Sequence, residues 1–151
     1  MNISEAVRRA ALTAIGSVVI DGVTIPVFDE VVNPNVVIPT VRNAKVYIIL
    51  QDQQEAEGRQ NFCSYRQQAN WTIKAVTIFN TAGVANKRLS EDVGEIIEKR
   101  IKPTGKTHAL VDANGYSFQD TNKVYSRNNT EITKSAVSFS KILIFNTTVN
   151  N

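Results

Sequence analysis

The chain has 151 residues, 42% of them hydrophobic and 21% charged, and its formal net charge is +3 at pH 7. This composition is ordinary for a globular protein, and the length predicts one domain that buries about two-thirds of the surface of the unfolded chain. A single cysteine excludes an internal disulfide, and no apolar run approaches the length that crosses a membrane. The mild basicity permits contact with nucleic acid without predicting it.

An amphipathic helix is predicted at the start of the chain. Its apolar stripe consists of Ile3, Val7, Ala10, Ala11 and Ala14. Gly16 is expected to end this helix, because glycine readily adopts the left-handed conformation found at helix ends. The Asp21-Gly22 pair predicts a hairpin turn before a short strand at Val23–Phe28. Pro26 cannot donate a hydrogen bond to a sheet, so we expect an edge strand or a strand end there.

A loop at residues 29–40 leads into the first strongly apolar strand. The loop carries prolines and an apolar cluster that includes Val36 and Val37. Apolar residues in such a loop either pack under the domain or form a surface for a partner, and we expect Val36 and Val37 to contact a partner. The next segment, Lys45–Leu50, is apolar after its first residue, which predicts a central strand.

Residues 51–66 form the most distinctive segment of the sequence. They are polar, include Gly58, and join two strongly apolar strands, so we expect a long loop built as an extension of a hairpin. Loops of this length without structure of their own are usually functional or disordered, and this one is predicted to contact a partner or a neighbouring subunit. The candidate contact residues in it are Asp52, Gln54, Glu55, Glu57, Arg59, Phe62, Tyr65 and Arg66.

The centre of the chain predicts a long strand followed by a helix that covers it. Trp71–Phe79 is rich in residues that suit a pleated sheet, and both of its faces become apolar towards Phe79, so we expect that end to be covered on both sides. Leu89–Ile101 has an apolar stripe with the helical period. Ser90 is a candidate N-cap, and Gly94 is expected to let a neighbour pack closely.

The last third of the chain is predicted to add strands to the sheet. Thr107–Asp112 and Tyr116–Gln119 are expected to form a hairpin about the turn at Ala113–Gly115. Residues 120–129 are polar and fit either a strand or a loop, whereas Ser135–Phe145 is predicted to be the last strand. These elements predict a single α+β domain, with a mostly antiparallel sheet packed by an N-terminal helix and one central amphipathic helix.

The order of these elements resembles that of the bacteriophage tail-terminator and tail-completion proteins. The likeness is carried by Val23–Asp29 after the first helix, by Val46–Leu50 after the proline loop, by Trp71–Phe79 after the polar excursion, and by the helix Leu89–Ile101. Together these segments span nearly the whole chain. The chain departs from the family in the long stretch at residues 120–133.

The resemblance implies a structural protein of the virion rather than an enzyme. It implies a homo-oligomeric ring, on the order of six or twelve copies, at the head–tail junction or neck, which assembles in the cytoplasm of a bacterial host. The partners it implies are further copies of the chain, the neck or portal-adaptor proteins above the ring and the tail proteins below it. It implies no catalytic residue, no cofactor and no membrane partner.

An alternative reading, a small nucleotide- or DNA-binding domain, rests on the turn Gly105-Lys106-Thr107. This turn resembles the end of a phosphate-binding loop. The full pattern needs a glycine where this chain has Arg100, and it needs a strand before it and a helix after it, whereas here a helix is predicted before it. The competing interpretation is a plain turn that stops the helix.

Basic residues give a second possible contact with nucleic acid. Arg8, Arg9, Lys87 and Arg88 could face DNA in the channel of a ring, although scattered solubilising charges are the favoured interpretation. His108 and Cys63 are the only residues of their types and lie far apart in the sequence. They therefore predict neither a metal site nor a nucleophile with its base.

Overall fold

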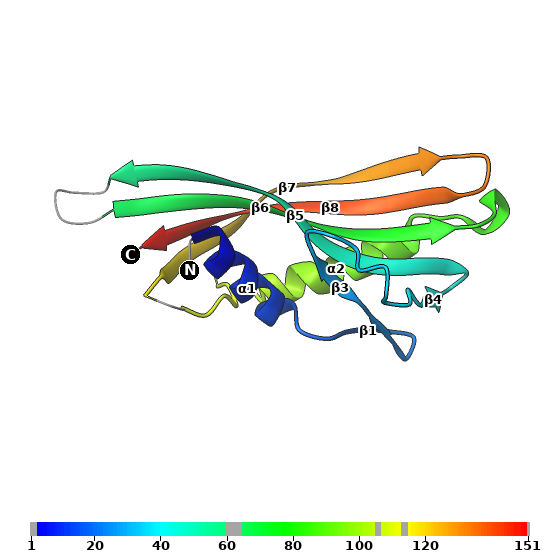
Figure 1. The fold of residues 1–151 in the computed structure, drawn as a ribbon, viewed down its shortest axis with the longest axis horizontal. Helices are drawn as coiled ribbons and strands as arrows, with labels where there is room; N and C mark the ends of the chain where they lie inside the picture. Colours follow the sequence, from blue (N-terminus) through cyan, green and yellow to red (C-terminus); the bar gives the residue numbers. More distant parts are fainter. Residues whose placement is uncertain (1–2, 60–64, 105–106, 113–114, 151) are drawn as a thin grey trace.

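The computed structural model describes residues 3–59, 65–104, 107–112 and 115–150, except for the side chains of residues 52–59, 65, 66 and 82 (Figure 1). It has two α-helices, a short 3-10 helix and a predominance of strands. In chain order the elements are α1 (Ile3–Ile15), β1 (Val18–Ile20), β2 (Val23–Ile25), β3 (Val27–Asp29), β4 (Thr40–Val41), β5 (Ala44–Arg59), β6 (Tyr65–Phe79), η1 (Ala82–Val84), α2 (Arg88–Ile101), β7 (Ser117–Ile132) and β8 (Val137–Asn150).

One long sheet runs the length of the molecule (Figure 1). Its strand order is β3-β5-β6-β8-β7, and β4 adds to the outer side of β5. All of its pairs are antiparallel except β3 with β5. β1 and β2 form a separate hairpin below the sheet. The α+β class that the sequence predicts is confirmed.

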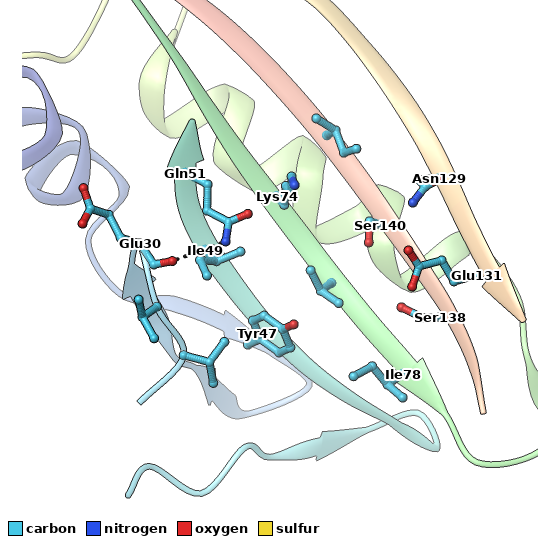
Figure 2. Close-up of a pocket in the computed structure, with 14 residues that line it drawn as sticks. Glu30, Tyr47, Ile49, Gln51, Lys74, Ile78, Asn129, Glu131, Ser138 and Ser140 are labelled. Carbon is cyan, nitrogen blue, oxygen red and sulfur yellow. Dashed lines mark hydrogen bonds between the residues drawn. The ribbon is translucent and has the colours of Figure 1, made fainter. Parts of the chain in front are cut away.

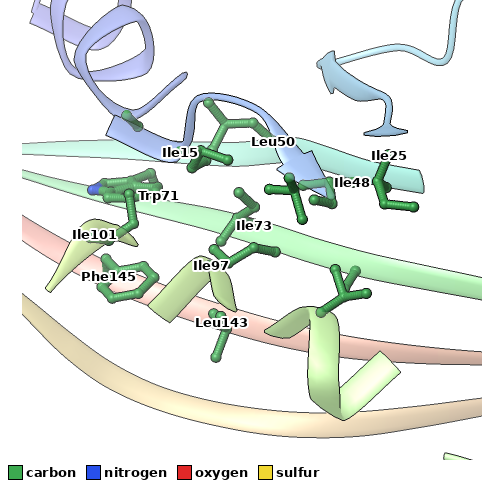
Figure 3. Close-up of a cluster of buried hydrophobic side chains, with 14 of the residues drawn as sticks. Ile15, Ile25, Ile48, Leu50, Trp71, Ile73, Ile97, Ile101, Leu143 and Phe145 are labelled. Carbon is green, nitrogen blue, oxygen red and sulfur yellow. The ribbon is translucent and has the colours of Figure 1, made fainter. Parts of the chain in front are cut away.

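Both helices lie against the same face of the sheet, and the main core lies between them (Figures 1 and 3). Alternate residues of the sheet point into this core because side chains alternate across a strand. Its largest fully buried side chains are Ile15, Ile25, Ile48, Leu50, Trp71, Ile73, Phe79, Leu89, Ile97, Ile101, Leu143 and Phe145. The predicted helices and the apolar strands at Lys45–Leu50 and Trp71–Phe79 are therefore confirmed as the packing units of the domain.

Trp71 is the centre of this core. Its ring stacks on Phe145 with the ring centroids 4.8 Å apart. Its Nε1–H donates a 2.9 Å hydrogen bond to the hydroxyl of Thr147, which in turn lies 3.0 Å from the hydroxyl of Thr121. Because these residues come from β6, β8 and β7, one buried polar chain ties three strands together without leaving the indole N–H unpaired.

The start of α2 differs from the prediction. Ser90 lies within the helix and its hydroxyl donates to the carbonyl of Lys87, the residue at the N-cap, which makes no side-chain cap bond. Asn86 lies one residue earlier, and its side-chain oxygen accepts from the backbone N–H of Arg88. The interpretation of Ser90 as the N-cap is therefore wrong, because an asparagine outside the apolar stripe accepts the N–H of Arg88.

Several turns follow from local chemistry. Gly16 ends α1 with φ of +59° and donates to the carbonyl of Leu12, as predicted. Asp21-Gly22 forms the turn of the β1–β2 hairpin. Pro26 divides the predicted strand at Val23–Phe28 into two, because β2 ends before it on one sheet and β3 begins after it on the other.

The strands extend further than the sequence predicts. The expected hairpin extension at residues 51–66 is confirmed, since β5 and β6 pair as far as Arg59 and Tyr65. The expectation of a loop is wrong for residues 51–59, 65 and 66, which belong to these strands, and residues 60–64 lie outside the described part of the chain. Residues 120–129, for which the sequence left strand or loop open, belong to strand β7. Residues 146–150 belong to β8. Thr107–Asp112, predicted as a strand, makes only an isolated bridge at Thr107. The loop at residues 29–40 is present between β3 and β4, over residues 30–39.

An arginine fastens the corner where the small hairpin meets the sheet and α2. Arg42 has φ of +49°, in the tight turn between β4 and β5. Its guanidinium binds Asp21 at 2.8 Å and Asp92 at 2.9 Å, which joins the β1–β2 turn and the first turns of α2 to this corner. The guanidinium holds the pKa of the Asp21 carboxyl below its ordinary value of 3.8.

We expect Arg42→Gln to lower Tm near neutral pH, and the deficit to shrink in acid. The depressed pKa of Asp21 means that its charge stabilises the fold above pH 3.8 and loses that effect as the pH falls below it. Thermal unfolding of both proteins at neutral pH and below pH 3.8 measures the difference. Arg88→Gln, at an exposed arginine without an ion pair to the described residues, is the matched control. A deficit independent of pH would contradict the role of Asp21.

Candidate functional site

The helices leave the outer face of the sheet open (Figures 1 and 2). Register places one transverse row of this face at Tyr47, Val76, Ser140 and Asn129, contributed by four successive strands. No described helix covers this face, and only the loop after β3 approaches it, through residues 30–32. The expectation that the sheet is covered on both sides near Phe79 is therefore confirmed only in part: on the outer side Val76 is buried and Ile78 partly buried, but no described helix lies over them.

A hollow of about 500 Å³ lies on this open face. Its apolar floor is formed by Tyr47, Ile49, Val76, Ile78 and Ile142. Its polar lining is formed by Glu30, Gln51, Lys74, Asn129, Glu131, Ser138 and Ser140 (Figure 2). Lys74, Ser138 and Ser140 lie on the central strands, in register with Ile142, Ile78 and Val76. A hollow lined by apolar side chains with polar groups among them is typical of a contact surface for a macromolecule or a ligand.

The floor belongs to a second, smaller apolar cluster. Phe28, Ile49 and Val76 are buried together, and the ring of Phe28 meets that of Tyr47 edge-on at a centroid distance of 5.9 Å. Burial raises the pKa of the Tyr47 hydroxyl, and the negative charge of Glu131 raises it further. The tyrosine is therefore a neutral hydrogen-bonding group at physiological pH, and the hollow is suited to binding through apolar contact and hydrogen bonds to its polar lining.

Two strand edges provide a second kind of contact surface. β7 pairs with β8 on one side and with no other described strand, so one side of its 16 residues is unpaired. β5 is covered by β3 and β4 only as far as Leu50, and beyond that residue it pairs with no described strand other than β6. Unpaired edges carry free N–H and C=O groups that can pair with another chain.

The predicted contact residues of segment 51–66 lie on the arm formed by β5 and β6. The backbone of Asp52, Gln54, Glu55, Glu57, Arg59, Tyr65 and Arg66 belongs to these two strands. Their side chains lie outside the described part of the structure, as do Phe62 and Cys63 entirely. The arm reaches beyond the helices at one end of the molecule (Figure 1). Contact of these residues with a partner remains a prediction.

The other predicted contact residues, Val36 and Val37, are on the surface. Val36 is 39% exposed and Val37 89% exposed, in the loop between β3 and β4. The backbone N–H of Val36 donates to the carbonyl of Asn33, which fixes a turn just before the exposed pair. Of the two alternatives for this loop, packing under the domain does not apply to Val37, and contact with a partner remains a prediction.

The first two candidate DNA-facing residues are held by carboxylates. Arg8 lies 3.0 Å from Asp29 and 2.6 Å from Glu30, and only 21% of its side chain is exposed. Arg9 pairs with Glu5 at 2.9 Å, one turn earlier on α1. Because each guanidinium already has an acidic partner, this part of the surface offers little net positive charge to a phosphate backbone.

The other two, Lys87 and Arg88, lie elsewhere on the molecule. Both are exposed at the start of α2. Arg8 lies beside the Leu50 end of the covered part of β5, whereas Arg88 lies near its Ala44 end. Those two positions on β5 are roughly 20 Å apart at the usual rise per residue of a strand. The structure therefore does not bring the four basic residues together.

The turn with the phosphate-loop resemblance follows the C-terminal end of α2. Gly105 and Lys106 lie outside the described residues, and the flanking hydroxyls of Thr104 and Thr107 are 2.8 Å apart. A helix C-terminus carries partial negative charge, which disfavours a phosphate. His108 Nε2 lies 3.2 Å from the carbonyl of Gln119. Within the described ranges, no three side chains among His, Cys, Asp and Glu are grouped to hold a metal ion.

Comparisons with known proteins do not assign the chain to a family. Neither the protein-family models nor the curated proteins give a match. In the part of the chain that the structure describes, no helix combines the length and apolar character that a membrane crossing requires.

Sequence reasoning did not identify the outer hollow as a site. The sequence does contain the apolar residues of this face: Tyr47 and Ile49 alternate with inward residues of β5, and Val76 and Ile78 alternate with inward residues of β6. A strand that is apolar on both sides predicts burial on both sides, and only the position of the helices shows which face is left open.

Proposed function

We propose that this protein is a structural component of a bacteriophage virion that assembles into a homo-oligomeric ring at the head–tail junction. The order of its elements resembles that of tail-terminator and tail-completion proteins. The class of the fold agrees with what that family implies. On this proposal its activity is assembly, and its partners are further copies and the adjoining neck and tail proteins.

The observation that carries the proposal is the paired arm of β5 and β6. Gln54 to Arg59 pairs with Tyr65 to Asn70, beyond the part of β5 that β3 covers. The β6 side of this arm pairs with the end of β8 and contributes Ala69 to the core, whereas the β5 side has no further described partner strand. Its free edge and the open outer face can instead contact a neighbouring subunit. One such contact, repeated about an axis, closes a ring.

The first test is the native mass of the purified protein across a range of concentrations. We expect multi-angle light scattering to give one discrete ring-sized species, and negative-stain electron microscopy to give closed rings. A strict monomer at every concentration, which also fails to add to tail tubes or portal complexes in reconstitution, would overturn the proposal.

Shortening the arm is expected to abolish ring formation without unfolding the domain. Replacing residues 57–67 by a two-residue Asn-Gly turn joins Ala56 to Gln68, which already face each other, and so keeps the register. No described core residue lies in the excised segment, although Val149 and Asn150 of β8 lose their partners Gln67 and Arg66. Circular dichroism and Tm provide the folding control. Rings of normal mass from the shortened protein would count against the role of the arm.

No observation favours the nucleotide- or DNA-binding alternative. Arg8 and Arg9 are already paired with carboxylates, and the Thr104–Thr107 turn sits at the wrong end of a helix for a phosphate. A salt titration of DNA binding distinguishes the two classes of function, since contacts with phosphates weaken steeply as salt rises.

A further inference from the structure

The second half of β7 has an open and regular edge. From Tyr125 to Ile132 it pairs with β8 residue by residue, whereas irregularities at Phe118/Asp120 and Lys123/Tyr125 interrupt the first half. Bulges and prolines protect strand edges from pairing with other chains, and the second half contains neither. Seven of its eight residues are exposed, all but Ser126. This half-strand is available to another strand.

We propose that residues Ser126–Ile132 pair antiparallel with the same residues of a second copy, about a two-fold axis at Asn129. Arg127 and Glu131 lie two positions on either side of Asn129, on the same outer face. Neither forms an ion pair with the described residues. In the proposed dimer, each Arg127 lies directly opposite the Glu131 of the other copy, so the contact contains two complementary charge pairs.

Charge selects this register among its neighbours. A two-fold axis normal to the sheet keeps each side chain on its own face of the sheet. Residues on the same face must therefore be opposite each other, and the axis must lie midway between the two copies of one residue. An axis at Arg127 or at Glu131 places like charges opposite each other, which destabilises the pair. An axis at Asn128 or at Thr130 leaves both charges without an opposite partner. Only the axis at Asn129 pairs every charge of the half-strand.

The same register also fixes which residues face each other on the inner side of the sheet. Ile132 is 77% exposed in the single copy, and the proposed pairing places it opposite Ser126 on the inner face. The joined sheet also brings the two outer hollows onto one continuous face. This contact differs from the ring contact of the proposed function, because a two-fold contact joins two free copies or two rings and cannot close a ring by itself.

Disulfide trapping tests the contact directly. In a Cys63→Ser background, Asn129→Cys places the two thiols opposite each other, within the Cα separation that a disulfide spans. Asn128→Cys is the matched control, since its two copies would be displaced along the strands, roughly 7–8 Å apart or more. We expect mild oxidation to yield covalent dimer from Asn129→Cys at least about tenfold faster than from Asn128→Cys. Equal rates, or no dimer from Asn129→Cys, would overturn the proposal.

Charge reversal tests the register independently. Arg127→Glu alone, or Glu131→Arg alone, puts two like-charge pairs into each dimer, whereas the double reversal restores both attractions. In the Asn129→Cys protein we expect each single change to slow trapping at least about tenfold, and the double change to restore it. Sedimentation velocity on the same variants with asparagine at position 129 gives a second readout that needs no engineered thiol. A double variant as weak as the singles would refute the pairing. Disulfide trapping detects this two-fold contact whether or not rings form. Its result therefore tests the contact independently of the proposed function.

Discussion

Replacing Trp71 with alanine is expected to lower the free energy of unfolding by about 3–5 kcal/mol. The side chain is fully buried at the centre of the core, where it stacks on Phe145 (Figure 3). Its removal leaves a large cavity beneath α2 and ends the hydrogen bond to Thr147. Urea unfolding followed by circular dichroism measures the loss, because the substitution removes the only tryptophan as a fluorescence probe.

Two smaller changes separate packing from hydrogen bonding at this site. Trp71→Phe keeps much of the packing, and Thr121 remains a partner for the Thr147 hydroxyl. Thr147→Val instead leaves the buried indole N–H of Trp71 without an acceptor, which costs about 1–3 kcal/mol. A Trp71→Ala protein within about 1 kcal/mol of the wild type would contradict the central role of this residue.

Gly94→Ala is expected to destabilise the protein by about 1–3 kcal/mol, although alanine favours a helix by about 1 kcal/mol over glycine. A Cβ atom at position 94 would lie 2.6 Å from Cγ and 3.3 Å from Cβ of Lys141. These atoms are the base of the lysine side chain, on the strand that α2 crosses, so they cannot move aside as its ammonium end can. Chemical unfolding of the single variant measures the cost.

The same substitution in a Lys141→Ala background separates steric conflict from helix propensity. Truncation removes the Cγ atom at 2.6 Å and leaves only Cβ at 3.3 Å. We therefore expect Gly94→Ala to become nearly neutral or slightly stabilising in that background. An equal loss in both backgrounds would show that the cost does not come from this contact.

The elements that pack the core could be predicted from the sequence because their periodicity is strong. The apolar stripe of Leu89–Ile101 and the alternation in Trp71–Phe79 each report one buried face. Gly94 was also expected to allow close packing, and the contact with Lys141 confirms it. The turn at Asp21-Gly22 could be predicted because it depends on the conformational preferences of these two residues alone.

The polar ends of the strands could not be predicted in this way. Residues 120–132 of β7 are mostly exposed and carry no apolar alternation, so their strand conformation depends on pairing with β8. Thr147 and Thr148 are buried in β8, although the segment reads as a polar tail. Their burial depends on partners far along the chain, such as Trp71 for Thr147, and a local pattern cannot report it.

Some of the candidate contact surfaces could likewise be predicted from the sequence, and others could not. The exposure of Val37 could be suspected from its place between prolines, and the arm could be suspected from its polarity. The open hollow and the free edge of β7 follow from strand order, which places β7 outermost and both helices on one face. Strand order is a property of the whole chain, because β6 and β8 are neighbours although α2 and β7 lie between them in sequence.

The pairing of β6 with β8 has a consequence for the kinetics of folding. β5–β6 and β7–β8 are hairpins of adjacent strands and need only short loop closures, whereas β6–β8 joins residues as distant as Arg66 and Asn150. Contacts of such high sequence separation slow folding, so the union of the two hairpins is expected to limit the rate. Trp71 meets Phe145 only when this union forms. The single tryptophan therefore serves as a built-in stopped-flow reporter of the slow step.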